Sequence, residues 1–445
     1  MRGRDRERSL KKAHKMATGR WEFAINAESP YYAGRRTADL VSGAPRARRA
    51  DADRFLPRWS EEQGDRLREA VMHGSPAVPR PTWRERDRYV PRMVLRRDCA
   101  NVKSNIVNSP IAFSDEAQTL AYATAQSVVI NPGSCLAVGY QERATAVASF
   151  TPSSGGFFST VGWLPTSVLL YGSSFGGVVV RDVTRAGVTM HGAPTTLPEG
   201  PNNAVRAIEP YGDQTFVYTT ANVVRRRDIR TPGAEILLRM PRGIPCSLAY
   251  NQQRHLLACG THSGMAILHD VTGDRTLHIS SVGGESKAGV HTLAWCPWNS
   301  SVLAMGTSMP DGGITLWDTH DPEAPEVIKV VRRTQRDQVR ALLWSPQKER
   351  GEIVAVHRDS PPDLVFWDAA SCREVGTAAD PERTAIPRDT VGVACDKTNR
   401  CVFTLATDNR LRVFAAWPYI PGAHTDVITP AEERIAQAYS YRWRF

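Results

Sequence analysis

The sequence contains no run of about 18 apolar residues, and no apolar signal-peptide segment opens the chain. We therefore expect no membrane anchoring. The eight cysteines form no C-x-x-C pair and show no zinc-ligand spacing, and several lie inside apolar, strand-like runs. A free thiol in such a run behaves as a small hydrophobic side chain. These features favour a reducing compartment, and we expect the protein in the nucleus and the cytoplasm.

Motifs of the common catalytic and nucleotide-binding sites are also missing. The chain has no G-x-x-x-x-G-K-[ST], H-E-x-x-H or G-x-S-x-G. None of the 11 His residues falls into metal-ligand spacing with a carboxylate or a Cys. The sequence therefore predicts a protein that is not an enzyme, with no catalytic residue, no metal site and no cofactor.

The excess of positive charge belongs to the N-terminal part of the chain. The formal net charge is +10, and residues 1–100 alone hold 24 Lys and Arg against 14 Asp and Glu. The remaining 345 residues hold 32 of each sign. A basic arm can bind nucleic acid, act as an import signal or dock on acidic protein, and we favour the last two roles over nucleic acid.

From about residue 108 the sequence repeats a pattern of short apolar runs that end in turn residues. Each copy has the pattern of three short strands, with room for a fourth before the next copy. Seven copies are present, at 111–131, 159–182, 205–230, 246–270, 291–318, 340–368 and 392–415. Several close on Trp-Asp or a relic of it, namely Trp317-Asp318, Trp367-Asp368, Arg181-Asp182 and His269-Asp270.

Repeats of this length that close on Trp-Asp are typical of WD-type propeller blades, and a closed ring of blades removes open sheet edges. The predicted fold is all-β: a seven-bladed WD-repeat β-propeller over 108–416. A basic, largely extended N-terminal arm (1–107) precedes it, and a short C-terminal tail (417–445) follows. We assign the Trp and Asp residues to blade packing and turn capping rather than to catalysis.

The ordered set of blades resembles the fizzy-type coactivators of the anaphase-promoting complex. The fifth repeat, "AWCPWNSSVLAMGTSMPDGGITLWD", is similar to the fifth blade of that family. "STVGW…GGVVVRDVTRAG" resembles the second blade, "RRRDIRTP" the end of the third and "QVRALLWSP" the start of the sixth. The resemblance implies a non-catalytic adaptor in cell-cycle control, in mitosis or meiosis. Its implied partners are subunits of the ubiquitin ligase, degron-bearing protein substrates and checkpoint proteins.

The resemblance also identifies a candidate docking peptide in the arm. Residues Asp53, Arg54, Phe55, Leu56, Pro57 and Arg58 resemble the ligase-binding C-box of the family, Asp-Arg-Phe/Tyr-Ile-Pro-x-Arg. Here Leu replaces Ile, and the last Arg comes one position early. Proline stiffens an extended peptide and lowers the cost of ordering it, while Arg offers a planar fork to carboxylates.

A second candidate lies about thirty residues further on, at Asp87, Arg88, Tyr89 and Pro91. The segment "MVLRR" that follows is similar to the short Lys-Ile-Leu-Arg element of the family, and it adds Leu95 and Arg96 to the docking candidates. Its spacing from the first copy favours the first copy as the C-box. We expect the second copy to belong to the strap that leads into the propeller.

At the positions where the family binds degrons, this chain departs from the pattern. The resemblance places the degron surface at His262, Met309, Gln338, Thr390 and Asn409, of which only Gln338 keeps the family identity. In the expected destruction-box groove, Leu-Asp is replaced by Thr124-Ala125. A site that has lost its polar partners cannot keep the same specificity.

The last residues differ as well. The family ends in Ile-Arg, which docks on the ligase, whereas this chain ends in Arg444-Phe445, and these two residues are the C-terminal docking candidates. Two alternatives therefore stay open. One is a WD-propeller scaffold of another multiprotein assembly, without a link to ubiquitin ligation. The other is association with RNA through the basic arm.

Overall fold

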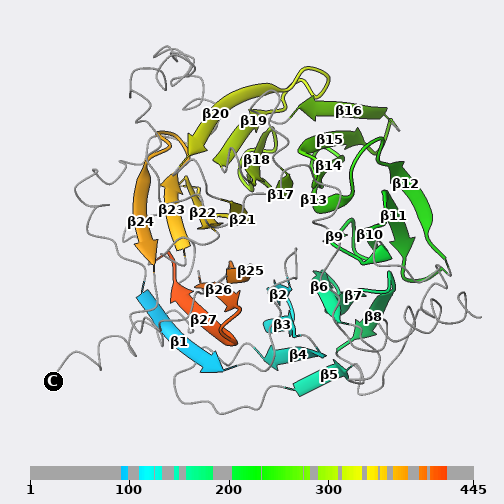
Figure 1. Cartoon of the computed structure of the whole chain (residues 1–445), viewed down its shortest axis with the longest axis vertical. Helices are drawn as coiled ribbons and strands as arrows, with labels where there is room; N and C mark the ends of the chain where they lie inside the picture. The colour runs from blue at the N-terminus through cyan, green and yellow to red at the C-terminus, as the bar shows by residue number, and fades with distance from the viewer. Residues whose placement is uncertain are drawn as a thin grey trace, which may run out of the picture. The chain divides into compact units, whose positions relative to one another are not determined.

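The computed structural model describes residues 92–98, 110–124, 126–132, 145–149, 157–183, 203–231, 233–273, 275–280, 289–308, 313–332, 338–348, 351–357, 364–378, 390–397 and 401–417. All of them lie in the unit Glu61–Phe445. The regular elements in these ranges are 27 β-strands, which form seven antiparallel sheets arranged as the blades of a ring (Figure 1). The predicted seven-bladed, all-β propeller is thereby confirmed. No helix in the described part of the chain is long and apolar enough to span a membrane.

Blades 1 to 4 follow one another along the chain, and each first strand lies toward the centre of the ring (Figure 1). Blade 1 contains β2 (Ile111–Ser114), β3 (Thr119–Ala123), β4 (Ser127–Pro132) and β5 (Thr145–Ser149). Blade 2 contains β6 (Phe158–Leu164), β7 (Val168–Ser173) and β8 (Val178–Asp182). Blade 3 contains β9 (Ile208–Pro210), β10 (Thr215–Thr220), β11 (Val223–Asp228) and β12 (Glu235–Arg239). Blade 4 contains β13 (Pro245–Asn251), β14 (Leu256–Thr261), β15 (Met265–Asp270) and β16 (Arg275–Ser280).

Blades 5 to 7 complete the ring. Blade 5 contains β17 (Val290–Trp295), β18 (Val302–Thr307), β19 (Gly313–Asp318) and β20 (Glu326–Arg332). Blade 6 contains β21 (Val339–Trp344), β22 (Glu352–His357), β23 (Leu364–Asp368) and β24 (Glu374–Ala378). Blade 7 contains β25 (Thr390–Asp396), β26 (Cys401–Ala406) and β27 (Arg410–Ala415). The seven repeats identified in the sequence coincide with the first three strands of these blades.

The fourth strand of blade 7 comes from a distant part of the chain. Strand β1 (Arg92–Asp98) pairs antiparallel with β27, so that the last sheet has the order β1-β27-β26-β25. The first strand of blade 1 also contacts that of blade 7, and the ring is closed there as well. Strand β1 thus covers the edge of β27 that would otherwise offer unpaired backbone groups to other chains.

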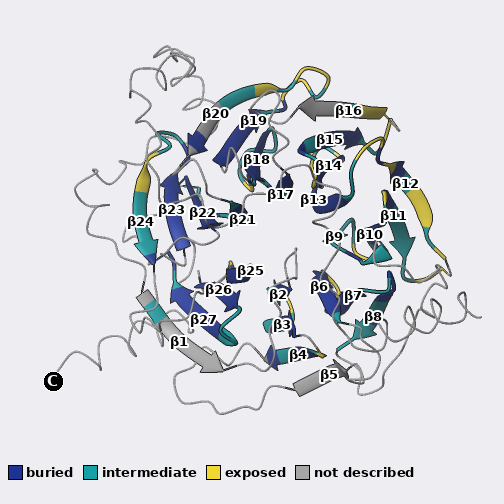
Figure 2. Ribbon diagram, in the orientation of Figure 1, coloured by how far each residue is buried: buried dark blue, intermediate teal, exposed yellow. Residues whose placement is uncertain are grey.

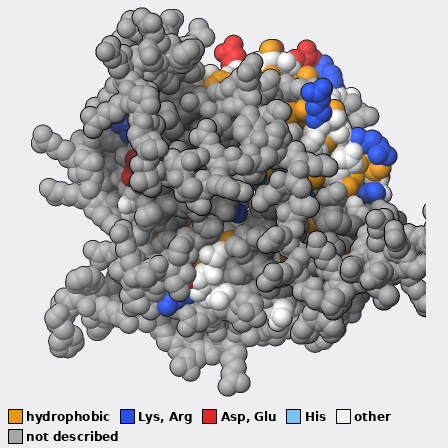
Figure 3. Space-filling view, in the orientation of Figure 1, with side chains coloured by type: hydrophobic (Ala, Val, Ile, Leu, Met, Phe, Trp, Pro, Cys, Tyr) orange, Lys and Arg blue, Asp and Glu red, His pale blue; other side chains and the backbone are white. Residues whose placement is uncertain are grey.

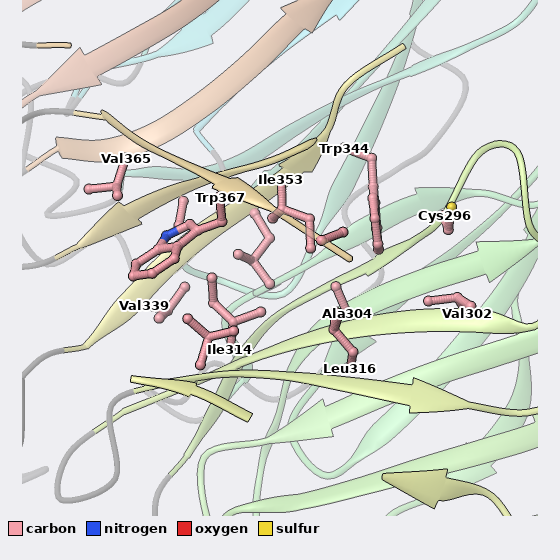
Figure 4. Packing of buried hydrophobic residues seen from close by; sticks show 14 residues of the cluster. Cys296, Val302, Ala304, Ile314, Leu316, Val339, Trp344, Ile353, Val365 and Trp367 are labelled. Atoms are coloured by element: carbon pink, nitrogen blue, oxygen red, sulfur yellow. The ribbon is translucent and has the colours of Figure 1, made fainter. Parts of the chain in front are cut away.

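Apolar side chains fill the seams between neighbouring blades. Most of the residues in the inner strands of the blades are accordingly buried (Figure 2). The largest cluster joins blades 5 and 6, where Trp344 and Trp367 pack with aliphatic residues of both sheets (Figure 4). The second strands of blades 4 to 7 are buried along their whole length, as in "VLAMGT" of β18, because they have a sheet neighbour on each side and a blade on each face. A strand buried on both faces has a continuous apolar sequence rather than an alternating one, which explains the apolar runs of the repeats.

Three Trp side chains tie a blade to its predecessor. Each stands at or near the end of a first strand, is half-buried or buried, and donates its indole N–H to a carbonyl in the first strand of the preceding blade. The pairs are Trp163 with Ala112 at 3.2 Å, Trp295 with Ala249 at 3.1 Å and Trp344 with Ala294 at 2.9 Å. A buried indole needs such an acceptor, and the repetition sets the spacing between blades.

The Trp-Asp pairs have the roles predicted for them. Trp317 and Trp367 are both 6% exposed and belong to inter-blade clusters. Asp270, Asp318 and Asp368 follow or end their strands and accept hydrogen bonds from the backbone N–H groups of Thr272, His320 and Ser371, respectively. These carboxylates cap the turns that lead to the outer strands.

Candidate functional site

The register of the blades defines two faces of the ring. In blade 4 the first residue of β13, Pro245, pairs with the last residue of β14, Thr261. The turn after β14 therefore lies beside the start of β13, and the amide of His262 donates to the carbonyl of Ile244 at 3.1 Å. The same pairing recurs in blades 2, 5, 6 and 7. We call this side, where first strands begin, the upper face, and the side where they end the lower face.

The upper rim is built tightly because glycines end several second strands. A Cβ on Gly172 would lie 2.6 Å from Val205, which precedes the first strand of the next blade. On Gly306 it would lie 2.7 Å from Val339 and 2.5 Å from Thr292. Only a glycine lets the two blades approach this closely. The starts of the first strands in these neighbouring blades are therefore held close to one another.

A bulge follows the first residue of the first strand in blades 2, 4, 5, 6 and 7. Bulges turn a side chain out of the normal alternation. In two blades the bulged residue reaches the next blade: Ser159 donates to the carbonyl of Val205 at 2.5 Å, and the thiol of Cys246 to that of Val290 at 3.0 Å. Four of the described cysteines are buried, and burial raises the thiol pKa of Cys246 to about 12, as expected for structural rather than reactive thiols.

His262 is the best-defined member of the predicted degron surface. It is exposed in the turn between β14 and β15, and its Nδ1 accepts the backbone N–H of Ile244 at 2.8 Å. Partial burial lowers the pKa of the imidazole, the nearby carbonyl of Ile244 raises it, and the positive charge of Arg206 lowers it further. The ring is therefore neutral at pH 7 and keeps its Nε2–H as a donor on the upper face.

The other predicted surface residues differ in what they offer. Gln338 is half-buried directly before β21, on the upper face. Thr390 begins β25 on the same face but is only 5% exposed, so its short side chain presents little to a ligand. Asn409 lies in the β26–β27 turn with a φ of 61°, a left-handed conformation that Asn tolerates well. Met309 lies outside the described residues.

A buried ion pair supports the turn that carries Asn409. The guanidinium of Arg412 is fully buried and donates from both terminal nitrogens to the carboxylate of Asp408, at 3.1 Å in one of the two bonds. In the destruction-box position, Thr124 is buried and its hydroxyl binds the backbone of Ser127. Both residues hold turns in place. The acidic residue of the family falls at Ala125, which lies outside the described residues.

The docking candidates have mostly to be judged from the sequence. Asp53, Arg54, Phe55, Leu56, Pro57 and Arg58 lie outside the described residues, and so do Asp87, Arg88, Tyr89, Pro91, Arg444 and Phe445. Leu95 and Arg96 are in β1, where their backbones pair with Val413 and Arg412 of β27. The "MVLRR" element is thus part of a strap on blade 7.

The sequence reasoning missed the arginines on the upper face of blades 3 and 4. Arg206 precedes β9, Arg239 ends β12 and Arg242 lies in the loop that leads to β13. The sequence could have revealed them, because the segments at the upper ends of the strands contain no Asp or Glu. These segments are 203–207, 219–224, 238–246 and 260–266. In the space-filling view, Lys and Arg side chains lie over β12 and β16 and acidic ones over the β19–β20 turn (Figure 3). The basic residue of β16 is Arg275, which belongs to the lower face and pairs with Glu323. Among the described residues, no group of three or more His, Cys, Asp or Glu is placed to hold a metal ion.

Comparison with known proteins finds relatives that match only part of this chain. No family model matches the chain. It is 29% identical over 125 residues to "Cell division cycle 20.6, cofactor of APC complex" of Arabidopsis thaliana, which covers 27% of this chain and 28% of the relative. It is 26% identical over 179 residues to "WD repeat-containing protein slp1" of Schizosaccharomyces pombe, covering 40% and 33%. The matches thus span about a third or less of the length of these relatives.

Comparison with solved structures shows the fold. A chain of a crystal structure of the mitotic checkpoint complex aligns with a TM-score of 0.58 at 20% identity, over 77% of this chain and 97% of that one. The β-propeller domain of Myceliophteria thermophila Cps50 (Swd1) aligns with a TM-score of 0.55 at 12% identity, over 74% and 100%. Both likenesses show a shared propeller architecture.

Proposed function

We propose that this protein is a divergent substrate-recruiting coactivator of the anaphase-promoting ubiquitin ligase. The observation that carries the proposal is the similarity of the propeller to relatives named as cofactors of that complex. Two features of the chain support it. A C-box-like peptide at 53–58 precedes the propeller, and the element that follows at the family-like spacing forms the closing strand β1.

In this mechanism the protein performs no chemistry. The N-terminal peptide binds the ligase, with Phe55 and Leu56 as apolar anchors and Arg54 and Arg58 as partners of carboxylates. The upper face of the propeller holds the substrate. Tethering raises the effective concentration of the substrate near the ligase, which increases the rate of ubiquitin transfer without any new catalytic group. We place this activity in the nucleus and the cytoplasm of dividing cells.

The test is a double substitution in the docking peptide. Arg54→Ala together with Pro57→Ala removes one guanidinium and the proline that stiffens the extended peptide, and we expect loss of co-purification with ligase subunits. Arg88→Ala serves as the matched control in the second copy, which we assign to the strap, and it retains the ligase. Wild-type recovery of the ligase by the double variant would show that the peptide is not the anchor.

A second candidate function is a scaffold for another multiprotein assembly. It is favoured by the altered upper face, where Thr390 is buried and His262 occupies a position at which the family has a different residue. Affinity purification of the full chain separates the two functions. Ligase subunits among the bound proteins support the coactivator, and their absence beside another stable set of partners supports the scaffold.

A further inference from the structure

Blades 3 and 4 segregate charge between the two faces of the ring. The acidic residues of these blades that the structure describes are Glu209, Asp213, Asp228, Glu235 and Asp270, and all lie in the lower half or in lower turns. The described segments that form the upper rim of both blades carry Arg206, Arg239, Arg242 and His262 and contain no carboxylate. The part of the upper rim that the structure describes in this sector is therefore positive.

Four arginines of the lower half of this sector have protein partners. Arg226 pairs with Glu235, Arg230 with Asp228 at 2.5 Å, and Arg275 with Glu323 of blade 5. Arg254 donates to the carbonyls of Thr319 at 2.6 Å and His320 at 3.0 Å, and so ties blade 4 to blade 5. In these contacts the guanidinium groups have carboxylate or carbonyl acceptors within the protein and stabilise the fold.

The arginines of the upper rim differ. Among the described residues, Arg206, Arg239 and Arg242 make no ion pair with a carboxylate. Arg239 and Arg242 are exposed, whereas Arg206 is half-buried and its Nε is shielded from solvent without a hydrogen-bond acceptor in the described part of the chain. Burial lowers the pKa of its guanidinium, opposed by the nearby Cys246 thiol. A desolvated cation without an anion is costly to the fold, and an external anion removes that cost.

The three arginines and His262 follow the seam between blades 3 and 4 from the centre of the ring to its edge. Arg206 is next to the innermost strand β9, His262 lies in the second-to-third-strand turn, and Arg239 ends the outermost strand β12. Three strand spacings of about 4.8 Å separate the innermost from the outermost strand, so the row is about 14 Å long. An extended peptide covers that distance with four to five residues, at about 3.3 Å each.

We propose that the upper rim of the blade 3–blade 4 seam is a docking site for an acidic peptide segment of a partner protein. The carboxylates of the segment meet Arg206, Arg242 and Arg239 in turn, and the Nε2–H of His262 donates to the peptide between them. Charge complementarity favours this occupant. Single-stranded RNA fits less well, because it needs aromatic stacking platforms and the described upper-rim segments of blades 3 and 4 contain no Phe, Tyr or Trp.

The experiment measures binding of a fluorescein-labelled ten-residue peptide of alternating Glu and Ser to the full chain by fluorescence anisotropy. Arg206→Gln combined with Arg242→Gln is compared with Arg230→Gln combined with Arg275→Gln, which removes the same charge from the lower face. We expect Kd to rise at least about tenfold in the upper-face variant and to stay within about twofold in the lower-face variant. Both double variants keep the basic N-terminal arm, so any binding of the peptide to the arm is the same in the two and does not affect the comparison of their Kd values.

Equal Kd values for the two double variants would overturn the proposal, and so would tighter binding of a ten-nucleotide poly(U) RNA that the upper-face changes weaken in the same way. Because Arg206 is partly buried, the exposed Arg242→Glu provides a second variant, and it should weaken the Glu peptide by about tenfold with an unchanged melting temperature. Recovery of ligase by these variants reports separately on the coactivator function, since the docking peptide at 53–58 is intact.

Discussion

At the residue scale, Glu209 shows how the ring creates an unusual environment for a single side chain. It lies on β9 and is half-buried against blade 4, where its carboxylate accepts the backbone N–H of Tyr250 at 3.3 Å. Burial raises the pKa of Glu209 to about 7, although the hydrogen bond from Tyr250 and the charge of Lys397 oppose the shift. The folded protein therefore holds this proton over a pH range in which the unfolded chain has released it.

This difference makes the stability dependent on pH. The unfolded glutamate has a pKa of 4.5, so the free energy of unfolding should fall as pH rises from about 4.5 to about 7. We expect the contribution of Glu209 to be about 1–2 kcal/mol, because the side chain keeps part of its solvation. Glu209→Gln should flatten the profile in this window. Urea unfolding at pH 5 and pH 7.5 measures it, and an unchanged slope in the variant would contradict the assignment.

At the element scale, a glycine at the end of a second strand determines how closely two blades approach. A side chain on Gly306 would meet Thr292 at 2.5 Å and Val339 at 2.7 Å, and both neighbours belong to packed strands. We expect Gly306→Ala to lower the free energy of unfolding by about 1–3 kcal/mol, the usual range for overpacking. Thermal and urea denaturation measure the effect.

Gly212 is the matched control for this substitution. It lies in the β9–β10 turn, where a Cβ would come no closer than 3.0 Å to the hydroxyl oxygen of Thr215. Gly212→Ala should leave the stability within about 0.5 kcal/mol of wild type. Equal losses for the two variants would mean that blade approach is not what Gly306 provides.

At the scale of the whole molecule, strand β1 joins a segment near residue 95 to the last blade of the ring. Its six paired residues cover the edge of β27. Removing residues 1–98 exposes that edge, and we expect a lower melting temperature, by more than about 5 °C, together with aggregation. Removing only residues 1–91 keeps β1 and serves as the control, with a melting temperature close to that of the full chain. Scanning calorimetry and light scattering distinguish the two truncations, and identical behaviour would show that β1 does not close the ring.

The resemblance to a known family describes the propeller better than its binding surface. It gives the expected blade order over the propeller, yet of the residues expected to bind degrons only Gln338 keeps the family identity, and Thr390 is buried. A binding surface depends on a few exposed side chains, which can be replaced without loss of the fold, whereas blade packing depends on many buried ones. The propeller is therefore better determined than its ligand.

The sequence by itself determined the number of blades, their strands and the capping role of the Trp-Asp pairs. These features follow from local apolar periodicity and turn chemistry, which each repeat carries in its own residues. Only the tertiary structure decided that the "MVLRR" segment is the closing strand, that Thr390 is buried, and that Arg206, Arg239 and Arg242 share a rim whose described segments contain no carboxylate. Those facts depend on contacts between residues far apart in the chain, and a repeat pattern contains no information about which side chain finds a partner across a seam.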